Sequence, residues 1–156
     1  MRPTLRSAVS TIAGCMLGAA LGTAQNDPGA ATSTMDGVYT TVQASRGEEA
    51  YFSLCVSCHP PGTMHSEPTF TTRWAARPLS DLYNVIKETM PKNDPGTLTP
   101  EESVQFVAYL LKMNGLPAGK TELSTEVEAL KQIRIETRAM RNGKVVAGPG
   151  SNRDAE

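Results

Sequence analysis

The chain has 156 residues, which is room for one modest domain with flanking segments. Its 15 basic and 16 acidic residues give a formal net charge of −1, so neither nucleic acid nor an anionic membrane surface is expected as a partner. Aromatic residues make up only 5%, and there are 11 prolines and 13 glycines, a balance that favours long loops over a large packed interior.

The first 24 residues have the features of a secretory signal peptide. Arg2 and Arg6 precede a run of small and apolar residues from 8 to 21, and the sequence GTAQ offers a small-residue cleavage site after Ala24. The run is shorter than the roughly 20 apolar residues that cross a bilayer, so no membrane span is expected. Cleavage leaves 13 basic and 16 acidic residues and a net charge of −3.

Cys15 allows a second interpretation of this segment. The sequence IAGC, which ends at Cys15, resembles the processing box of bacterial lipoproteins. In that case Cys15 is lipid-modified and anchors the exported protein to a membrane. Export is expected with either interpretation.

The first structured element is expected to follow a linker. Residues 25–41 are small and polar without helical periodicity, which predicts a flexible linker. A helix is expected over residues 46–55, because SRGE fits a capping box formed by Ser45 and Glu48. Gly47 in its first turn is a poor helix former, which indicates a close approach by another element.

Two further helices are expected in the second half of the chain. The stretch LSDLYNVIKETM predicts a helix with Ser80 as its cap and Met90 as its end, because a proline follows Met90. The stretch beginning TPEE predicts another, with Thr99 as the cap, Pro100 at the first helical position and Glu102 completing a capping box. This helix is expected to end at the NG of positions 114 and 115.

The C-terminal part of the chain is expected to extend this domain. Residues 124–140 form an extension, in which residues 124–135 predict a short helix and one extended segment. Residues 141–156 have the composition of a disordered tail. The folded domain is therefore placed at residues 42–123, and its fold class is all-α.

The sequence YFSLCVSCHP places Cys55, Cys58 and His59 within five residues. In an exported chain such a pair of cysteines is typical of a disulfide, a thiol redox pair, half of a zinc site or a covalent haem attachment. A redox pair needs a βαβ context, which this chain lacks, and a zinc site lacks ligands of suitable geometry, because only His65 remains beyond His59. Haem needs two thiols and an imidazole, which are present. One covalent haem c is expected, with a plain disulfide as the alternative.

The iron then needs a ligand on its other face. Beyond Pro60 the candidates are one histidine and four methionines: His65, Met64, Met90, Met113 and Met140. Met113 belongs to an apolar helix face, Met140 lies in a polar segment, and Met64 and His65 follow His59 by only five and six residues. Met90 ends a helix before a turn that can hold a thioether against iron. Met90 is the expected ligand, and His65 is its competitor.

The chain resembles a monohaem class I c-type cytochrome. The matching stretches are RGEEAYFSLCVSCH, FTTRWAARPLSDLYNVIKETMP and PGTLTPEESVQFVAYLLKMNGLPAGKTEL, which cover residues 46–123 in the family's order. It is similar in particular to cytochromes that are electron-accepting subunits or partners of periplasmic dehydrogenases, such as quinoprotein alcohol dehydrogenases and molybdenum sulfite dehydrogenases. Pro60 and Pro61 stand where many relatives have a glycine, which leaves the path of the next loop open.

The resemblance implies a fold and a set of ligands. The fold is the all-α cytochrome c fold, with three to five helices and long loops around one covalently attached haem. Cys55 and Cys58 form the thioether links, His59 is the proximal iron ligand and Met90 is the distal iron ligand.

The resemblance also implies that the first and last core helices cross. Gly47 allows this approach, so that Tyr51 or Phe52 meets Tyr109.

Trp74 and Arg73 have two interpretations. The indole N–H and the guanidinium group are suited to donate to the haem propionates, a role that the resemblance favours. The alternative is that Trp74 simply packs on the domain.

The expected function is that of a periplasmic electron carrier and not of an enzyme. Its iron accepts electrons from a dehydrogenase and passes them to an oxidase or another cytochrome. The alternatives are a tightly bound cytochrome subunit of a dehydrogenase complex and a haem peroxidase or gas-binding protein. The protein is expected in the periplasm, either soluble or lipid-anchored to a membrane through Cys15.

Overall fold

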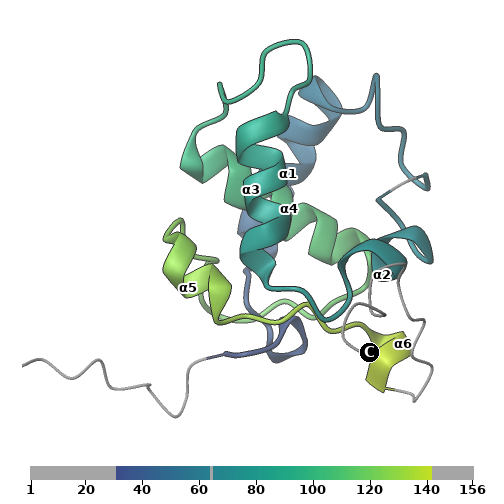
Figure 1. The fold of residues 1–156 in the computed structure, drawn as a ribbon, viewed down its shortest axis with the longest axis vertical. Coiled ribbons are helices and arrows are strands. Elements are labelled where there is room, and N and C mark those ends of the chain that lie inside the picture. Colours follow the sequence, from purple (N-terminus) through teal and green to yellow (C-terminus); the bar gives the residue numbers. More distant parts are fainter. Residues whose placement is uncertain (1–30, 64, 142–156) are drawn as a thin grey trace, which may run out of the picture.

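The computed structural model describes residues 31–63 and 65–141, and these residues form helices joined by loops, without a strand among them (Figure 1). The expected all-α fold class is confirmed. The helices in chain order are η1 (Thr34–Asp36), α1 (Thr41–Leu54), α2 (Thr69–Trp74), α3 (Leu79–Thr89), α4 (Pro100–Met113), α5 (Val127–Lys131) and α6 (Arg138–Arg141). Residues expected in the signal peptide, together with Cys15, Met64 and positions 142–156 of the expected tail, lie outside the described residues.

Helices α2 and α6 are very short. The sequence did not indicate α2 or α6, which have six and four residues. Helices of this length are too short to show a hydrophobic period, and their position depends on the elements that surround them.

Helix α1 begins earlier than expected. Its cap is Thr40, whose side chain accepts a hydrogen bond from the Gln43 amide at 3.1 Å. The prediction of Ser45 as the cap is wrong, because Ser45 lies within the helix. The local SRGE pattern was misleading because Thr40 offers the same capping chemistry one turn earlier.

The described part of the expected linker, residues 31–41, is folded. Ser33 caps η1 and forms a capping box with Asp36. Thr34 and Tyr39 are buried, and the Tyr39 hydroxyl donates to the Leu116 carbonyl at 2.7 Å. The domain therefore begins before residue 42, because contacts with the C-terminal half of the chain order this polar segment.

Helices α1 and α4 cross at Gly47, as expected. A Cβ atom on Gly47 would lie 1.9 Å from the Gln105 carbonyl oxygen, so only glycine fits this crossing. The rings of Tyr51 and Tyr109 meet nearby, with centroids 5.0 Å apart. Phe52 is 51% exposed and does not take this position.

The other two long helices agree with expectation except at one cap. Helix α4 has Thr99 as its cap, Pro100 at its first position and Glu102 in the capping box. Helix α3 ends at Thr89 with Met90 as the C-cap. The prediction of Ser80 as the cap of α3 is wrong, because the cap is Pro78 and Ser80 is buried within the first turn.

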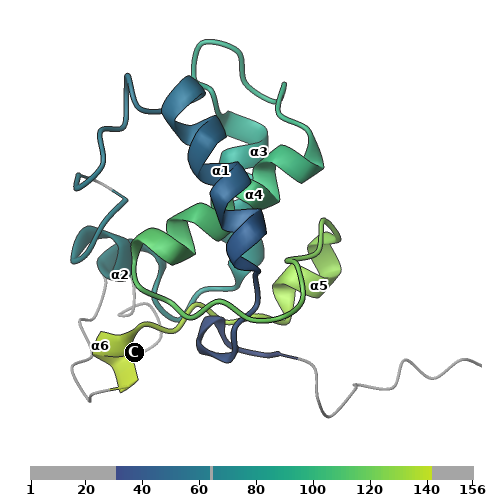
Figure 2. The same cartoon turned by 180° about the vertical axis from the view of Figure 1, so that it is seen from behind.

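The C-terminal segment, residues 116–137, packs on the same domain. Helix α5 and the extended residues after it run along the end of the molecule opposite to the C-terminal ends of α1 and α3 (Figures 1 and 2). Leu130, Ile133 and Ile135 are buried, and the Ile135 amide and carbonyl pair with Arg77 and Ala76. The expected short helix and extended segment are both present.

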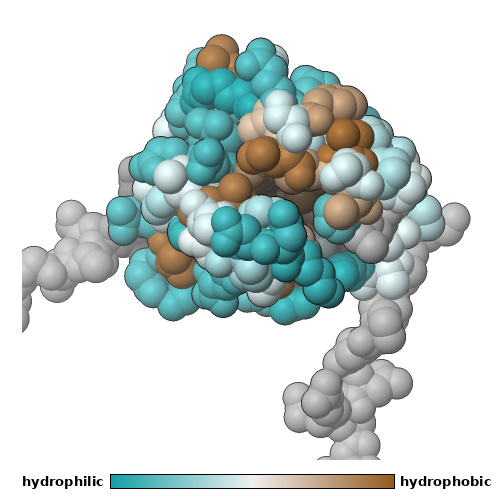
Figure 3. Space-filling view, turned by 90° about the horizontal axis from the view of Figure 1, so that it is seen from above, coloured by the Kyte–Doolittle hydropathy of each residue, from teal (hydrophilic) through white to brown (hydrophobic). Residues whose placement is uncertain are grey.

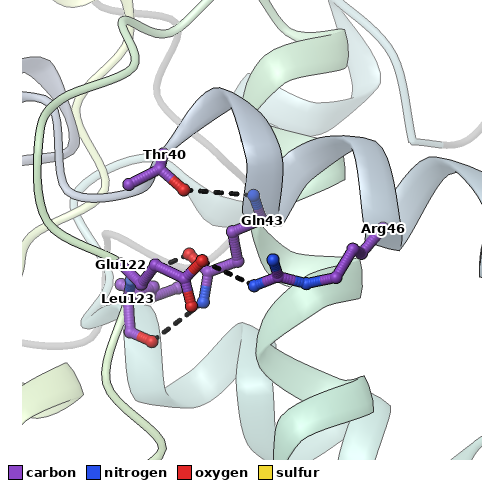
Figure 4. A network of polar contacts seen from close by, with 5 residues as sticks. All are labelled: Thr40, Gln43, Arg46, Glu122 and Leu123. Atoms are coloured by element: carbon purple, nitrogen blue, oxygen red, sulfur yellow. Dashed lines mark hydrogen bonds and ion pairs between the residues drawn. The ribbon is translucent and has the colours of Figure 1, made fainter.

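Helix α1 is tied to this segment by polar contacts (Figure 4). The Gln43 side chain donates to the Leu123 carbonyl at 3.0 Å and accepts from the Leu123 amide at 2.8 Å. An ion pair between Arg46 and Glu122, at 2.6 Å, lies at the surface beside it. Gln43 is buried, and these two hydrogen bonds give both its side-chain nitrogen and its side-chain oxygen a backbone partner.

None of the described helices combines the length and apolar character of a membrane span.

Candidate functional site

Cys55, Cys58 and His59 are presented by a single turn at the end of α1. Cys55 is the C-cap of the helix, and its carbonyl accepts from the Cys58 and His59 amides at 3.1 and 2.8 Å. Cys55 and His59 are half-buried, whereas Cys58 is exposed. The turn therefore brings two thiols and an imidazole together at the end of one helix.

Tyr51 fixes the end of this turn. Its hydroxyl donates to the His59 carbonyl at 2.5 Å. Burial raises the pKa of Tyr51 to about 12, with smaller contributions from Cys55 and Tyr109, so the hydroxyl stays protonated and remains a donor. Because the Tyr51 ring also packs against Tyr109, the position of the histidine backbone is coupled to the crossing of α1 and α4.

The geometry argues against the other uses of a cysteine pair. Cys55 and Cys58 do not form a disulfide with each other. Burial, and secondarily Cys58, raises the pKa of the Cys55 thiol to about 11, so this residue is not an activated redox nucleophile. Within the described part of the chain, no three His, Cys, Asp or Glu side chains come together as a metal site, which leaves zinc without a ligand set.

A hollow with an apolar rim lies at this end of the molecule. Figure 3 shows hydrophobic residues gathered around it, in the view onto the end where α1 and α3 finish. Phe52 and Leu54, on the last turn of α1, are about half exposed, at 51% and 49%. An apolar opening next to two thiols and an imidazole fits a flat, largely apolar, covalently attached group such as haem c.

Met90 lies at the same end of the molecule as the cysteine turn. It is the C-cap of α3, its amide donates to the Ile86 carbonyl at 3.1 Å, and its side chain is half-buried against the core. The loop that follows is closed by a hydrogen bond from the Asp94 amide to the Pro91 carbonyl at 2.9 Å. The backbone on both sides of Met90 is thus held, as a thioether ligand requires.

His65 lies beside His59. The two ring centroids are 4.6 Å apart, and the planes are inclined at 61°. Two imidazoles on opposite faces of one iron would have centroids about 6 Å apart, because each metal–nitrogen bond is about 2 Å. Burial lowers the pKa of His65 to about 4, with smaller contributions from His59 and Arg73. The position of His65 therefore suits a neighbour of the proximal histidine better than an opposing ligand.

Trp74 and Arg73 lie at the end of α2. Trp74 is 3% exposed, and the Arg73 and Arg77 guanidinium carbons lie 5.2 and 5.1 Å from the centre of its ring. Arg77 also pairs with Asp81 at 2.7 Å, whereas no carboxylate among the described residues pairs with Arg73. Of the two arginines beside Trp74, Arg73 is therefore the one that can bind a further anionic group.

Three residues of this region were not found from the sequence. For Tyr51 the sequence predicts only a place at the helix crossing, and no local pattern indicates its hydrogen bond to the His59 carbonyl. Arg77 lies three residues after Trp74, but helix α2 ends between them, so helical spacing gave no signal. The sequence predicts Asn114 only as part of the end of α4, yet its side chain donates to the His65 carbonyl at 2.8 Å.

The comparison with protein families identifies the same region. Residues 42–110 match the family described as cytochrome c oxidase, cbb3-type, subunit III. No curated protein and no solved structure matches the chain. The matched stretch runs from the start of α1 into α4 and includes the cysteine turn and Met90. The chain thus carries a c-type cytochrome domain, and the cofactor of this domain is covalently bound haem c.

Proposed function

We propose that this protein is a periplasmic electron carrier that accepts electrons from a dehydrogenase and passes them to an oxidase or another cytochrome. The observation that carries this proposal is the turn of Cys55, Cys58 and His59 beside an apolar hollow, within a c-type cytochrome domain. The chemistry that haem c supplies when bound is one-electron exchange between ferric and ferrous iron.

Four side chains are proposed to hold the haem. The thiols of Cys55 and Cys58 form the thioether links, and the His59 imidazole binds the iron from the proximal side. The Met90 thioether binds it from the distal side. A closed ligand shell of this kind leaves no position for a substrate, which supports electron transfer over peroxidase or gas-binding activity.

Arg73 and Trp74 are proposed to contact the haem propionates. Arg73 has a guanidinium group without a carboxylate partner in the described structure, close enough to His65 to lower the pKa of that residue. A cation here neutralises propionate charge, and an indole N–H adds a donor. Trp74 is also buried in the core, so the proposed donation to a propionate is compatible with a packing role.

A second candidate is a tightly bound subunit of a larger complex. The matched family is named after an oxidase subunit, and the resemblance from the sequence includes dehydrogenase subunits. In this chain the C-terminal segment packs on its own domain and so is not left open to wrap a partner. This observation favours the free carrier.

The test combines the state of the haem with the size of the native species. The protein expressed with its export signal should carry covalent haem, and the Cys55→Ser/Cys58→Ser variant should lose it. Size-exclusion chromatography of native extract, followed by haem absorbance, should show elution at the mass of a single chain. Elution with a dehydrogenase or oxidase would instead support the subunit, and wild-type protein without covalent haem would contradict both candidates.

A further inference from the structure

The imidazole of His65 lies against the imidazole of His59 in an edge-on arrangement. The centroid distance of 4.6 Å and the angle of 61° fall within the range that aromatic pairs prefer. Both side chains are half-buried. His65 therefore limits the rotation of the His59 ring and covers part of it from solvent.

The two rings are held from different helices. The His59 backbone is bound to α1, through the Cys55 carbonyl at 2.8 Å and the Tyr51 hydroxyl at 2.5 Å. The His65 carbonyl accepts from the Asn114 side chain, which follows α4, at 2.8 Å. Because α1 and α4 cross in tight contact at Gly47, the positions of both rings are set by the same rigid pair of helices.

Further contacts fix the backbone around His65. The Ser66 hydroxyl donates to the Met113 sulfur at 3.3 Å, and the Ser66 carbonyl accepts from the Phe70 amide at 3.0 Å. The residue after His65 is thus attached to both α4 and α2. A loop residue with anchors on two helices presents its side chain in one direction.

The hydrogen bond from Asn114 to the His65 carbonyl leaves another atom of the Asn114 side chain without a partner in the described part of the chain. Its amide nitrogen donates to the Leu110 carbonyl as well as to His65, but its Oδ1 atom is buried and has no hydrogen-bond partner among the described residues. A buried polar atom without a partner costs about 1–3 kcal/mol. The contact with His65 is thus kept although it leaves the oxygen unsatisfied.

We propose that His65 is a positioning residue that orients the proximal histidine His59 and shields it from water. This inference rests on the proposed function, in which His59 binds the haem iron. Groups that contact a metal ligand set its orientation and tune the metal, and solvent access to a haem lowers its potential because water favours the more highly charged ferric state. His65 thereby raises the midpoint potential without binding the iron.

The experiment compares His65→Ala, His65→Phe and the wild-type holoprotein. We expect His65→Ala to keep covalent haem and a six-coordinate low-spin spectrum, but to have a lower midpoint potential and altered EPR g values for the oxidised haem. His65→Phe should return both quantities toward wild type, because a flat ring fills the same place. Asn114→Ala should shift the g values in the same direction as His65→Ala.

Thr63→Ala is the matched control. Thr63 lies on the same loop and its hydroxyl donates to the Pro60 carbonyl at 2.6 Å, so the control removes a loop hydrogen bond without touching either imidazole. It should leave potential and g values unchanged. Wild-type g values and potential in His65→Ala, or a His65→Phe variant that behaves like His65→Ala, would overturn the inference.

Two other outcomes have distinct meanings. A sixth coordination position that opens in His65→Ala would make His65 a ligand and overturn the positioning role. Absence of covalent haem from the wild-type protein would refute the proposed function itself, whatever the variants show.

Discussion

Met90 and His65 differ in what surrounds them, and this difference separates their proposed roles. Met90 is the C-cap of α3 and is followed by a closed turn, so its backbone is held at the end of a helix. His65 is on the same loop as His59 and contacts its ring. Met90 and His65 can both bind iron, and their proposed roles differ because different elements hold them.

Replacing Met90 by alanine should open the sixth coordination position. In the proposed site Cys55, Cys58 and His59 still hold the haem, so attachment should persist while the midpoint potential falls and carbon monoxide binding appears. Spectroelectrochemical titration and carbon monoxide difference spectra measure these changes.

Met113→Ala is the control for Met90→Ala. Met113 is also half-buried, but it lies in α4 and its sulfur accepts from Ser66. This variant should remain six-coordinate. If Met113→Ala opened the iron and Met90→Ala did not, the proposed distal ligand would be wrong.

Between elements, the crossing of α1 and α4 determines where His59 and His65 lie relative to each other. Helix α1 ends in the cysteine turn, and α4 leads into Asn114, which binds the His65 carbonyl. The two helices approach most closely at Gly47. A change in their separation would therefore displace His59 and His65 relative to each other.

Gly47→Ala should destabilise the protein. Alanine improves helix propensity by about 0.5–1 kcal/mol, but the new Cβ would lie 1.9 Å from the Gln105 carbonyl oxygen, and overpacking costs about 1–3 kcal/mol, more when backbone must move. We expect a net loss of about 1–2 kcal/mol in the free energy of unfolding, measured by denaturant titration of the holoprotein. Ser53→Ala, an exposed change on the same helix, should stay within about 0.5 kcal/mol of wild type. Equal stability of Gly47→Ala and wild type would show that the helices separate at no cost.

Across the whole molecule, the C-terminal segment covers the end opposite to the proposed haem site. It pairs with the chain before α1 through the Gly119 amide and Tyr39 carbonyl at 2.7 Å, and with the chain between α2 and α3 through Ile135. Its helix α5 packs against α3, and Leu130, Ile133 and Ile135 belong to the hydrophobic core. The folded unit is therefore longer than the stretch matched by the family, which ends at residue 110.

Two truncations should distinguish the part of the C-terminal region that stabilises the protein from the tail after Met140. Removal of everything after Leu123 deletes the buried side chains of Leu130, Ile133 and Ile135, each worth about 1.5–3 kcal/mol of burial, and should strongly destabilise the holoprotein. Removal of everything after Met140 should leave haem binding and potential unchanged, because the glycine, proline and charge content of this tail offers no packing face. Thermal unfolding and redox titration measure both. A large shift of potential after the shorter truncation would contradict this division.

The sequence alone determined the features that depend on neighbouring residues. The turn of Cys55, Cys58 and His59, the capping box of α4 and the end of α3 before a proline each involve residues within five positions, so spacing and side-chain chemistry suffice to predict them. Gly47 also indicated a close crossing, because a glycine inside a helix is unfavourable unless another element requires it.

Only the tertiary structure decided the features that join distant parts of the chain. Thr40 rather than Ser45 begins α1 because the preceding segment is ordered by contacts with residues near 116–136, about 80–100 positions away. The bond from Asn114 to the loop of His65 spans 49 positions, and the Gln43 pairing with Leu123 spans 80. Such contacts form because packing of apolar faces brings the backbones together, and no local pattern in the sequence specifies which polar groups then meet.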